Sequence, residues 1–173
     1  RRCVDASGAP SQGAADELTG LTLVRNRLGG EGVVSLADAL GKGALAKLVL
    51  LGLGNNQIGD KGMISLSEAL RKGALAQCTR LYMGGNQIGD DGLFELAREL
   101  KKNEYLESLT LQRNRIVGNR RLATLAEAIS EHPTLRVLDL AHNKSGFQGA
   151  CHLATGLQVT EVLQKPSIAH NKF

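Results

Sequence analysis

The order of apolar and polar residues in this chain repeats one short pattern from near its beginning to its end. The stretch 48–62 shows it through four apolar positions and one asparagine: Leu48, Leu51, Leu53, Asn56 and Ile58. Leucine and glycine alternate over 51–53, and this period of two predicts a short strand with one buried face. The apolar residues of 62–70 follow at helical spacing, so the pattern predicts a strand and then a helix.

Aligned on its asparagine, the pattern occurs six times. The asparagines are Asn26, Asn56, Asn86, Asn114, Asn143 and Asn171, separated by 30, 30, 28, 29 and 28 residues by subtraction. Apolar triplets stand eight, five and three residues before them, starting at Leu18, Leu48, Cys78, Leu106 and Leu135, with a less regular sixth of Leu163, Pro166 and Ile168. A unit of this length is typical of a solenoid, because each copy needs its neighbours to bury its apolar face.

We therefore expect an α/β solenoid with parallel strands on the concave face and helices on the convex face. The repeats define a domain over 18–173 with about five to six units. Residues 1–17 depart from the pattern and are expected to form an irregular segment or a degenerate cap. The sequence stops after a strand and its asparagine. We expect a truncated last unit, whose face further repeats or another chain would cover.

The six asparagines have a structural interpretation. Where a strand ends and the chain turns inward, buried backbone donors and acceptors have no strand partner, which is costly. An asparagine amide supplies both donors and an acceptor, so it can pair with its own turn and with a neighbouring one. We expect these residues to form a structural asparagine ladder.

The positive charge of the chain is concentrated in its second half. Residues 1–100 hold eleven Lys and Arg and eleven Asp and Glu, whereas 101–173 hold ten and six, which accounts for the net charge of +4. Beside the last three asparagines stand Arg113, Arg115, His142, Lys144, His170 and Lys172. Like charges on adjacent strands repel, so the cluster is a candidate site for an acidic segment of a partner. A solvated rim is the alternative.

Residues that carry catalysis or hold cofactors do not form a recognisable set. Gly52 and Gly54 resemble part of a dinucleotide fingerprint, but the third glycine and the ribose-binding acid are missing. His142 and His170 occupy equivalent positions and could share a metal with Asp139, yet no Cys/His spacing signature accompanies them. We expect no enzymatic activity, no cofactor and no metal. No apolar run approaches the ~20 residues of a membrane span, and the cysteine pattern favours a reducing compartment.

The repeated residues also resemble a known family. The spacing Leu-x-x-Leu-x-Leu-x-x-Asn-x-Ile-Gly with a helical Leu-x-x-Ala-Leu, as in 48–70, is similar to the ribonuclease-inhibitor-like class of leucine-rich repeats. That class includes ribonuclease inhibitor, Ran GTPase-activating protein, tropomodulin and the sensor domains of NOD-like receptors. The resemblance covers about 18–173. It implies a horseshoe-shaped solenoid that binds proteins through its concave face and loops, in the cytoplasm or within an intracellular assembly.

The expected function is a non-enzymatic protein-binding or scaffold module that forms part of a larger protein or assembly. On the row of residues expected at strand centres, which includes Asp139, Tyr82 alone resembles an interface anchor. The candidate partner-binding residues are Tyr82, Arg113, Arg115, Asp139, His142, Lys144, His170 and Lys172. No specific nucleic-acid partner is expected. One alternative is a regulator such as a GTPase-activating protein, with Arg25 or Arg113 acting in trans. Another is a binder of an anionic polymer or lipid headgroups.

Overall fold

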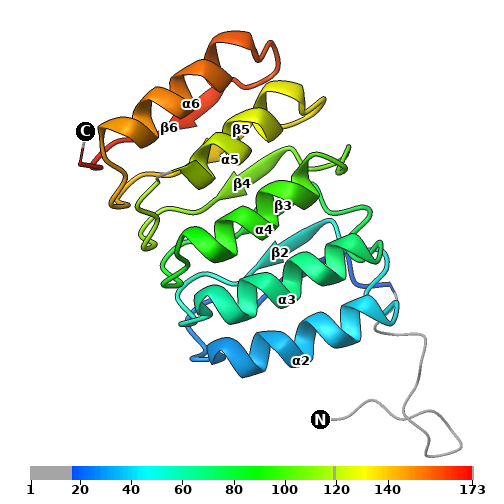
Figure 1. Ribbon diagram of the computed structural model, residues 1–173. Coiled ribbons are helices and arrows are strands. Elements are labelled where there is room, and N and C mark those ends of the chain that lie inside the picture. The colour runs from blue at the N-terminus through cyan, green and yellow to red at the C-terminus, as the bar shows by residue number, and fades with distance from the viewer. Residues whose placement is uncertain (1–16, 119, 173) are drawn as a thin grey trace, which may run out of the picture.

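Short strands and helices alternate along the chain in the computed structural model, which describes residues 17–118 and 120–172 (Figure 1). The strands are β1 (Gly20–Thr22), β2 (Leu50–Gly52), β3 (Arg80–Tyr82), β4 (Ser108–Thr110), β5 (Val137–Asp139) and β6 (Lys165–Ser167). The helices of the described residues are α2 (Gly29–Gly41), α3 (Gly59–Arg71), α4 (Asp90–Leu100), α5 (Arg120–Glu131) and α6 (Phe147–Val159). Each strand with the helix that follows it forms one repeat.

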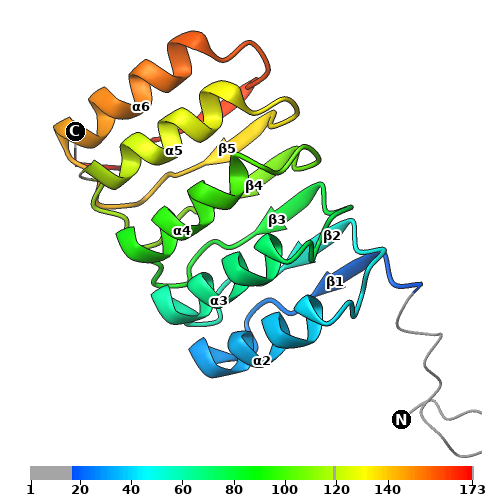
Figure 2. The same cartoon turned by 45° about the vertical axis from the view of Figure 1, so that its right-hand side comes forward.

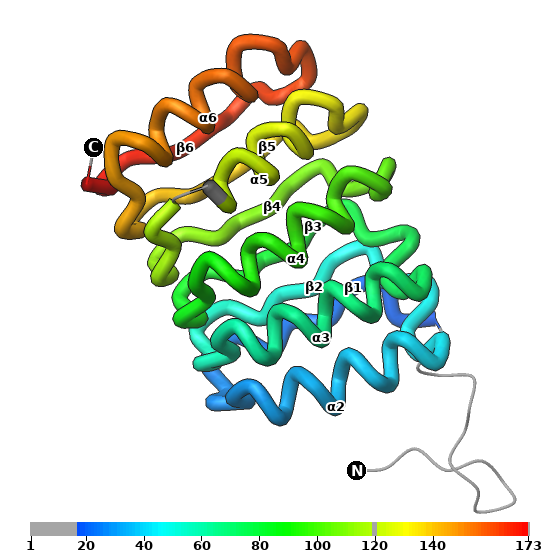
Figure 3. The backbone as a smooth tube through the Cα atoms, viewed as in Figure 1, coloured from blue at the N-terminus to red at the C-terminus, as the bar shows by residue number. Residues whose placement is uncertain are grey.

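The strands form one parallel sheet in sequence order, from β1 to β6. Their middle residues pair from strand to strand in one row: Leu21, Leu51, Leu81, Leu109, Leu138 and Pro166. The helices form a second layer on one side of this sheet, each beside the next (Figures 2 and 3). This arrangement confirms the predicted α/β solenoid. We call the opposite side of the sheet the concave face.

Aliphatic side chains fill the space between the sheet and the helices. Fully buried examples from successive repeats are Leu53, Met63, Leu66, Met83, Ile88, Leu96 and Leu111. Neighbouring helices approach most closely at small residues. A Cβ added to Gly156 of α6 would lie 2.5 Å from the carbonyl oxygen of Ala126 in α5. Burial between neighbouring repeats therefore stabilises the stack, as expected for a solenoid.

The row predicted at the strand centres lies one position further along the strands. Thr22, Gly52, Tyr82, Thr110, Asp139 and Ser167 are the last residues of their strands. The buried leucines occupy the centres, because the chain leaves the sheet after only three residues. Tyr82 and Asp139 therefore lie next to the turns that follow the strands.

The two ends of the described chain differ. Of the predicted N-terminal segment only Glu17 is described, and its carboxylate pairs with the Lys47 ammonium at 2.7 Å. At the other end, β6 contains Pro166, a residue tolerated on edge strands because it has no backbone N–H to donate.

No helix of the described residues combines the length and apolar character that crossing a membrane requires.

Candidate protein-binding site

The asparagine of each repeat lies in the turn that follows its strand. The Nδ2 of Asn86 donates to the carbonyl oxygens of Leu53 and Met83, both at 2.9 Å. Its Oδ1 accepts the backbone N–H of Asn56 at 2.7 Å. Amides that likewise donate to their own and the preceding turn belong to Asn56, Asn114, Asn143 and Asn171. These bonds tie consecutive turns together and fix the residues on either side of each asparagine.

The residue before each asparagine has a left-handed backbone. Its φ is 56° at Arg113, 56° at His142 and 57° at His170, whereas the third repeat has a glycine, Gly85, at this position. A left-handed conformation costs a residue with a Cβ about 1–2 kcal/mol. Charged and aromatic side chains thus occupy turn positions where glycine would be less strained. These turns are therefore a candidate binding surface.

A hollow of about 570 Å³ opens on the concave face beside these turns. It brings together four of the predicted partner-binding residues, Tyr82, Arg113, Asp139 and His142. Tyr82 and Asp139 end β3 and β5, and Arg113 and His142 follow β4 and β5 by three residues. Residues from three consecutive repeats therefore line one surface that combines an aromatic ring, a carboxylate and two basic groups.

The hollow exists because glycines line it on the side of the second and third repeats. Gly54, Gly84 and Gly85 contribute no side chains there. The Gln112 side chain takes up the space above Gly84, where an added Cβ would lie 2.6 Å from the Gln112 Cδ. The Gln112 Oε1 is buried and has no hydrogen-bond partner among the described residues. Glycine on one side and larger residues on the other give the hollow its shape.

The remaining basic candidates lie outside the hollow. Together with Arg113, which also lines the hollow, Arg115, Lys144 and Lys172 form what we call the basic rim; all four are exposed. The backbone N–H groups of the last three donate to turn carbonyls of the preceding repeat. The seven ion pairs found among the described residues involve other cations. The rim is therefore a row of charges that other described side chains do not neutralise.

The two candidate histidines lie against each other. The His142 and His170 rings stack with centroids 4.3 Å apart and planes 7° from parallel. The Oδ1 of Asp139 accepts the Ala141 backbone N–H at 2.9 Å. Within 17–118 and 120–172 no group of three or more His, Cys, Asp or Glu side chains is placed to hold a metal ion. The absence of a metal site in the whole chain stays a prediction.

Sequence reasoning missed Gln112 and the glycines that shape the hollow. Gly85 directly precedes its asparagine, whereas the others share the position two before it, where the chain has Val24, Gly54, Gly84, Gln112, Ala141 and Ala169. The change from glycine to glutamine between the third and fourth repeats was the available signal. It marks where a side chain again occupies this position of the concave face after two glycines.

Comparison with known proteins agrees with the architecture. A family model described as Leucine Rich repeat matches residues 45–67, 79–97 and 131–144. No curated protein matches the chain. Among solved structures, one titled "Leiomodin-1 Actin-Binding Site 2 (ABS2)" is similar with a TM-score of 0.65 and 21% sequence identity, over 83% of this chain and 83% of that one. The matched repeats and the shared fold support a leucine-rich repeat family, and the chain is an α/β leucine-rich repeat solenoid.

Proposed function

We propose that this chain is a non-enzymatic protein-binding or scaffold module, part of a larger protein or assembly, whose partner carries an acidic segment. The acidic segment lies along the basic rim, and a neighbouring apolar or aromatic side chain enters the concave hollow beside Tyr82. One observation carries the proposal: the hollow joins Tyr82 and Arg113 with Asp139 and His142 from adjacent repeats. Aromatic and arginine side chains in such a depression are typical binding hot spots.

The basic rim supports the acidic character of the partner. Its four cations stand on three adjacent repeats, so their backbones span two strand spacings, on the order of 10 Å. Their mutual repulsion is relieved when an acidic segment binds. Exposed ion pairs contribute only about 0.2–1 kcal/mol each. The rim is therefore expected to control the association rate and specificity, and the hollow to supply most of the affinity.

Site-directed photocrosslinking tests where the partner binds. A benzophenone amino acid in place of Tyr82 should give a discrete adduct in an extract of the native source. The matched control places the same group at Phe94 of α4, an aromatic residue on the helix side that contacts Arg98 and Arg121. Equal adducts from both positions would contradict binding at the concave face.

Charge reversal tests the rim. Arg113→Glu with Arg115→Glu should reduce the Tyr82 adduct, while Lys42→Glu with Lys72→Glu, the same change of charge at the ends of α2 and α3, should not. Raising the ionic strength from about 0.1 M to about 1 M shortens the screening length from about 10 to about 3 Å and should slow association. If neither the charge reversal of the rim nor the higher ionic strength changed the adduct yield, the rim would be a solvated surface without a role in binding.

Monomeric actin is a specific partner to test. The similar leiomodin-1 structure carries an actin-binding site in its title, but 21% identity transfers only the fold. Titration of labelled actin with the chain should show binding that the rim reversals weaken if actin is the partner. Lack of binding would exclude actin and leave the concave site to be identified by the crosslinked adduct.

We also propose the subtype of the repeats and the cellular setting of the protein. The repeat spacing of 28–30 residues and the position of the asparagine support the ribonuclease-inhibitor-like subtype. That resemblance also supports a cytoplasmic setting or an intracellular assembly.

A further inference from the structure

One helix position distinguishes the third repeat from the others. On the side of each helix that faces the preceding helix, α3, α5 and α6 have Ala69, Ala128 and Gly156, all buried. The equivalent residue of α4 is Glu99, which is 7% exposed. A small residue is needed between α5 and α6, where a Cβ at Gly156 would meet the Ala126 backbone. A carboxylate at this position requires additional space between α3 and α4.

That space arises from a change in loop length. The chain takes eight residues from Leu70 to Cys78 but only six from Leu100 to Leu106. Where the longer loop lies beside the shorter one, a hollow of about 290 Å³ remains at the edge of the solenoid opposite the asparagine turns. Leu75, Leu100 and Leu106 are among the apolar residues that line it. This second hollow is separate from the concave one.

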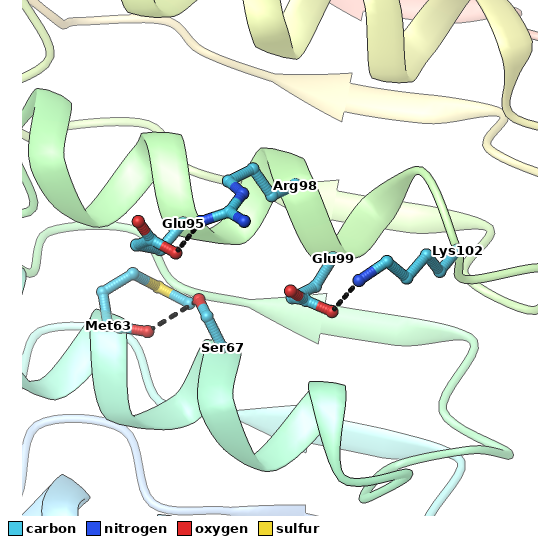
Figure 4. A network of polar contacts seen from close by, with 6 residues as sticks. All are labelled: Met63, Ser67, Glu95, Arg98, Glu99 and Lys102. Atoms are coloured by element: carbon cyan, nitrogen blue, oxygen red, sulfur yellow. Dashed lines mark hydrogen bonds and ion pairs between the residues drawn. The ribbon is translucent and has the colours of Figure 1, made fainter.

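Glu99 is the buried charge of this second hollow. The other charged residues that line it, Arg71, Lys102 and Glu104, are all exposed. The Glu99 Oε2 accepts from the Lys102 ammonium at 3.4 Å, and that lysine side chain is 69% exposed. Figure 4 shows this pair beside α4, together with the Glu95–Arg98 pair. The Glu99 Oε1 is not among the fully buried atoms without a hydrogen-bond partner, so this oxygen is accessible to solvent.

The position of Glu99 in its helix adds to the negative potential. Glu99 is the penultimate residue of α4, and the C-terminal end of a helix carries partial negative charge. A buried carboxylate is costly without a close cationic partner. The long contact with an exposed lysine supplies this only in part. The second hollow thus combines an apolar wall with an incompletely compensated negative charge.

We propose that the second hollow binds a small apolar molecule that carries one cationic group. The ammonium or guanidinium of the ligand donates to Glu99, and its hydrocarbon part contacts the leucine wall. Small-molecule sites share this composition of apolar lining and few polar groups. Charge complementarity with Glu99 selects a cation over a neutral or anionic molecule of the same shape.

Three probes of one shape test the proposal on the unmodified chain: 4-methylbenzylamine, 4-methylbenzyl alcohol and 4-methylbenzoate. For a ligand of this size we expect the amine to bind with a dissociation constant on the order of 1 mM. Amide shifts in two-dimensional NMR should move at Leu75, Leu100 and Leu106 and not at Tyr82. The alcohol and the benzoate should bind at least about tenfold more weakly, the ratio expected for one charge-assisted hydrogen bond.

Two variants locate the charge that is responsible. Glu99→Gln keeps the side-chain shape and should weaken amine binding about tenfold, while Glu104→Gln, an exposed acid lining the same hollow, should leave it unchanged. Equal binding of amine and alcohol, shifts outside the second hollow, or unchanged binding by Glu99→Gln would each overturn the proposal. The comparison of the three probes stands even if a variant does not fold, because it uses the unmodified chain.

Discussion

Replacing Asn86 with alanine removes the centre of the asparagine ladder. The substitution deletes the acceptor for the Asn56 backbone N–H and one donor to each of the Leu53 and Met83 carbonyls. Both carbonyls keep a second donor, the Nδ2 of Asn56 at 2.9 Å and of Asn114 at 3.1 Å. The Asn56 N–H keeps no partner among the described residues and is fully buried.

The size of the effect follows from this inventory. One orphaned buried N–H costs about 1–3 kcal/mol, and each net hydrogen bond lost costs about 0.5–1.5 kcal/mol. Since both carbonyls stay bonded, the orphaned N–H dominates, and we expect Asn86→Ala to lower the free energy of unfolding by about 1–3 kcal/mol. Urea unfolding at constant m-value measures this directly. For a domain of this size the melting temperature should fall by about 2–4 °C per kcal/mol.

Two controls distinguish the loss of ladder hydrogen bonds from the effect of replacing any asparagine in these turns. Asn26→Ala makes the same change at the exposed end, where the amide makes one bond, to the Val24 carbonyl at 3.3 Å, and should cost less than about 0.5 kcal/mol. Asn55 has φ 57°, so alanine would be strained there and Asn55→Gly is the appropriate neighbour control. If Asn86→Ala and Asn26→Ala lower stability equally, the hydrogen bonds of the ladder do not carry the stability assigned to them.

Three further changes probe other parts of the stack. Burial lowers the pKa of His132, so stability should be complete above the ordinary histidine pKa of about 6.5 and fall as pH drops below it. His132→Asn should remove that fall, because the asparagine amide does not titrate. The turn should keep its hydrogen bonds, since the Asn103 Oδ1 accepts the equivalent backbone N–H groups in the preceding repeat. An unchanged pH profile of urea unfolding would contradict this. Gly156→Ala should destabilise by about 1–3 kcal/mol despite better helix propensity, because its Cβ would lie 2.5 Å from the Ala126 carbonyl oxygen; a gain in melting temperature would refute it. Glu99→Ala should leave stability unchanged or raise it by up to about 1 kcal/mol, because it removes a buried carboxylate and leaves only an exposed lysine; a large loss in urea unfolding would mean that the ion pair stabilises the fold.

The sequence predicted the features that recur in every repeat, which are the strands, the helices and the asparagines of the turns, and missed features that depend on a difference between two neighbouring repeats. Leu51 and Leu81 are buried in adjacent strands, as their spacing indicates. The hollow beside Glu99 depends on the difference in length between two loops that only stacking brings together. The space above Gly84 is taken by Gln112, which lies two residues after β4, the strand that pairs with β3. Such features depend on how one repeat differs from its neighbour, and the pattern common to all repeats does not contain them.

The asparagine ladder holds the turns that carry the proposed binding surface. Arg113 and Arg115 flank Asn114, whose Oδ1 accepts the backbone N–H groups of Asn86 and Ile88 at 2.9 and 3.0 Å. Because these bonds hold the turn before any partner arrives, binding does not have to order its backbone, which would otherwise cost about 1–2 kcal/mol per residue. A rim on rigid turns also presents its charges at fixed spacing, and this favours a partner whose acidic residues match that spacing. In the proposed complex the buried asparagines would therefore contribute to recognition without touching the partner, by setting where the cations stand.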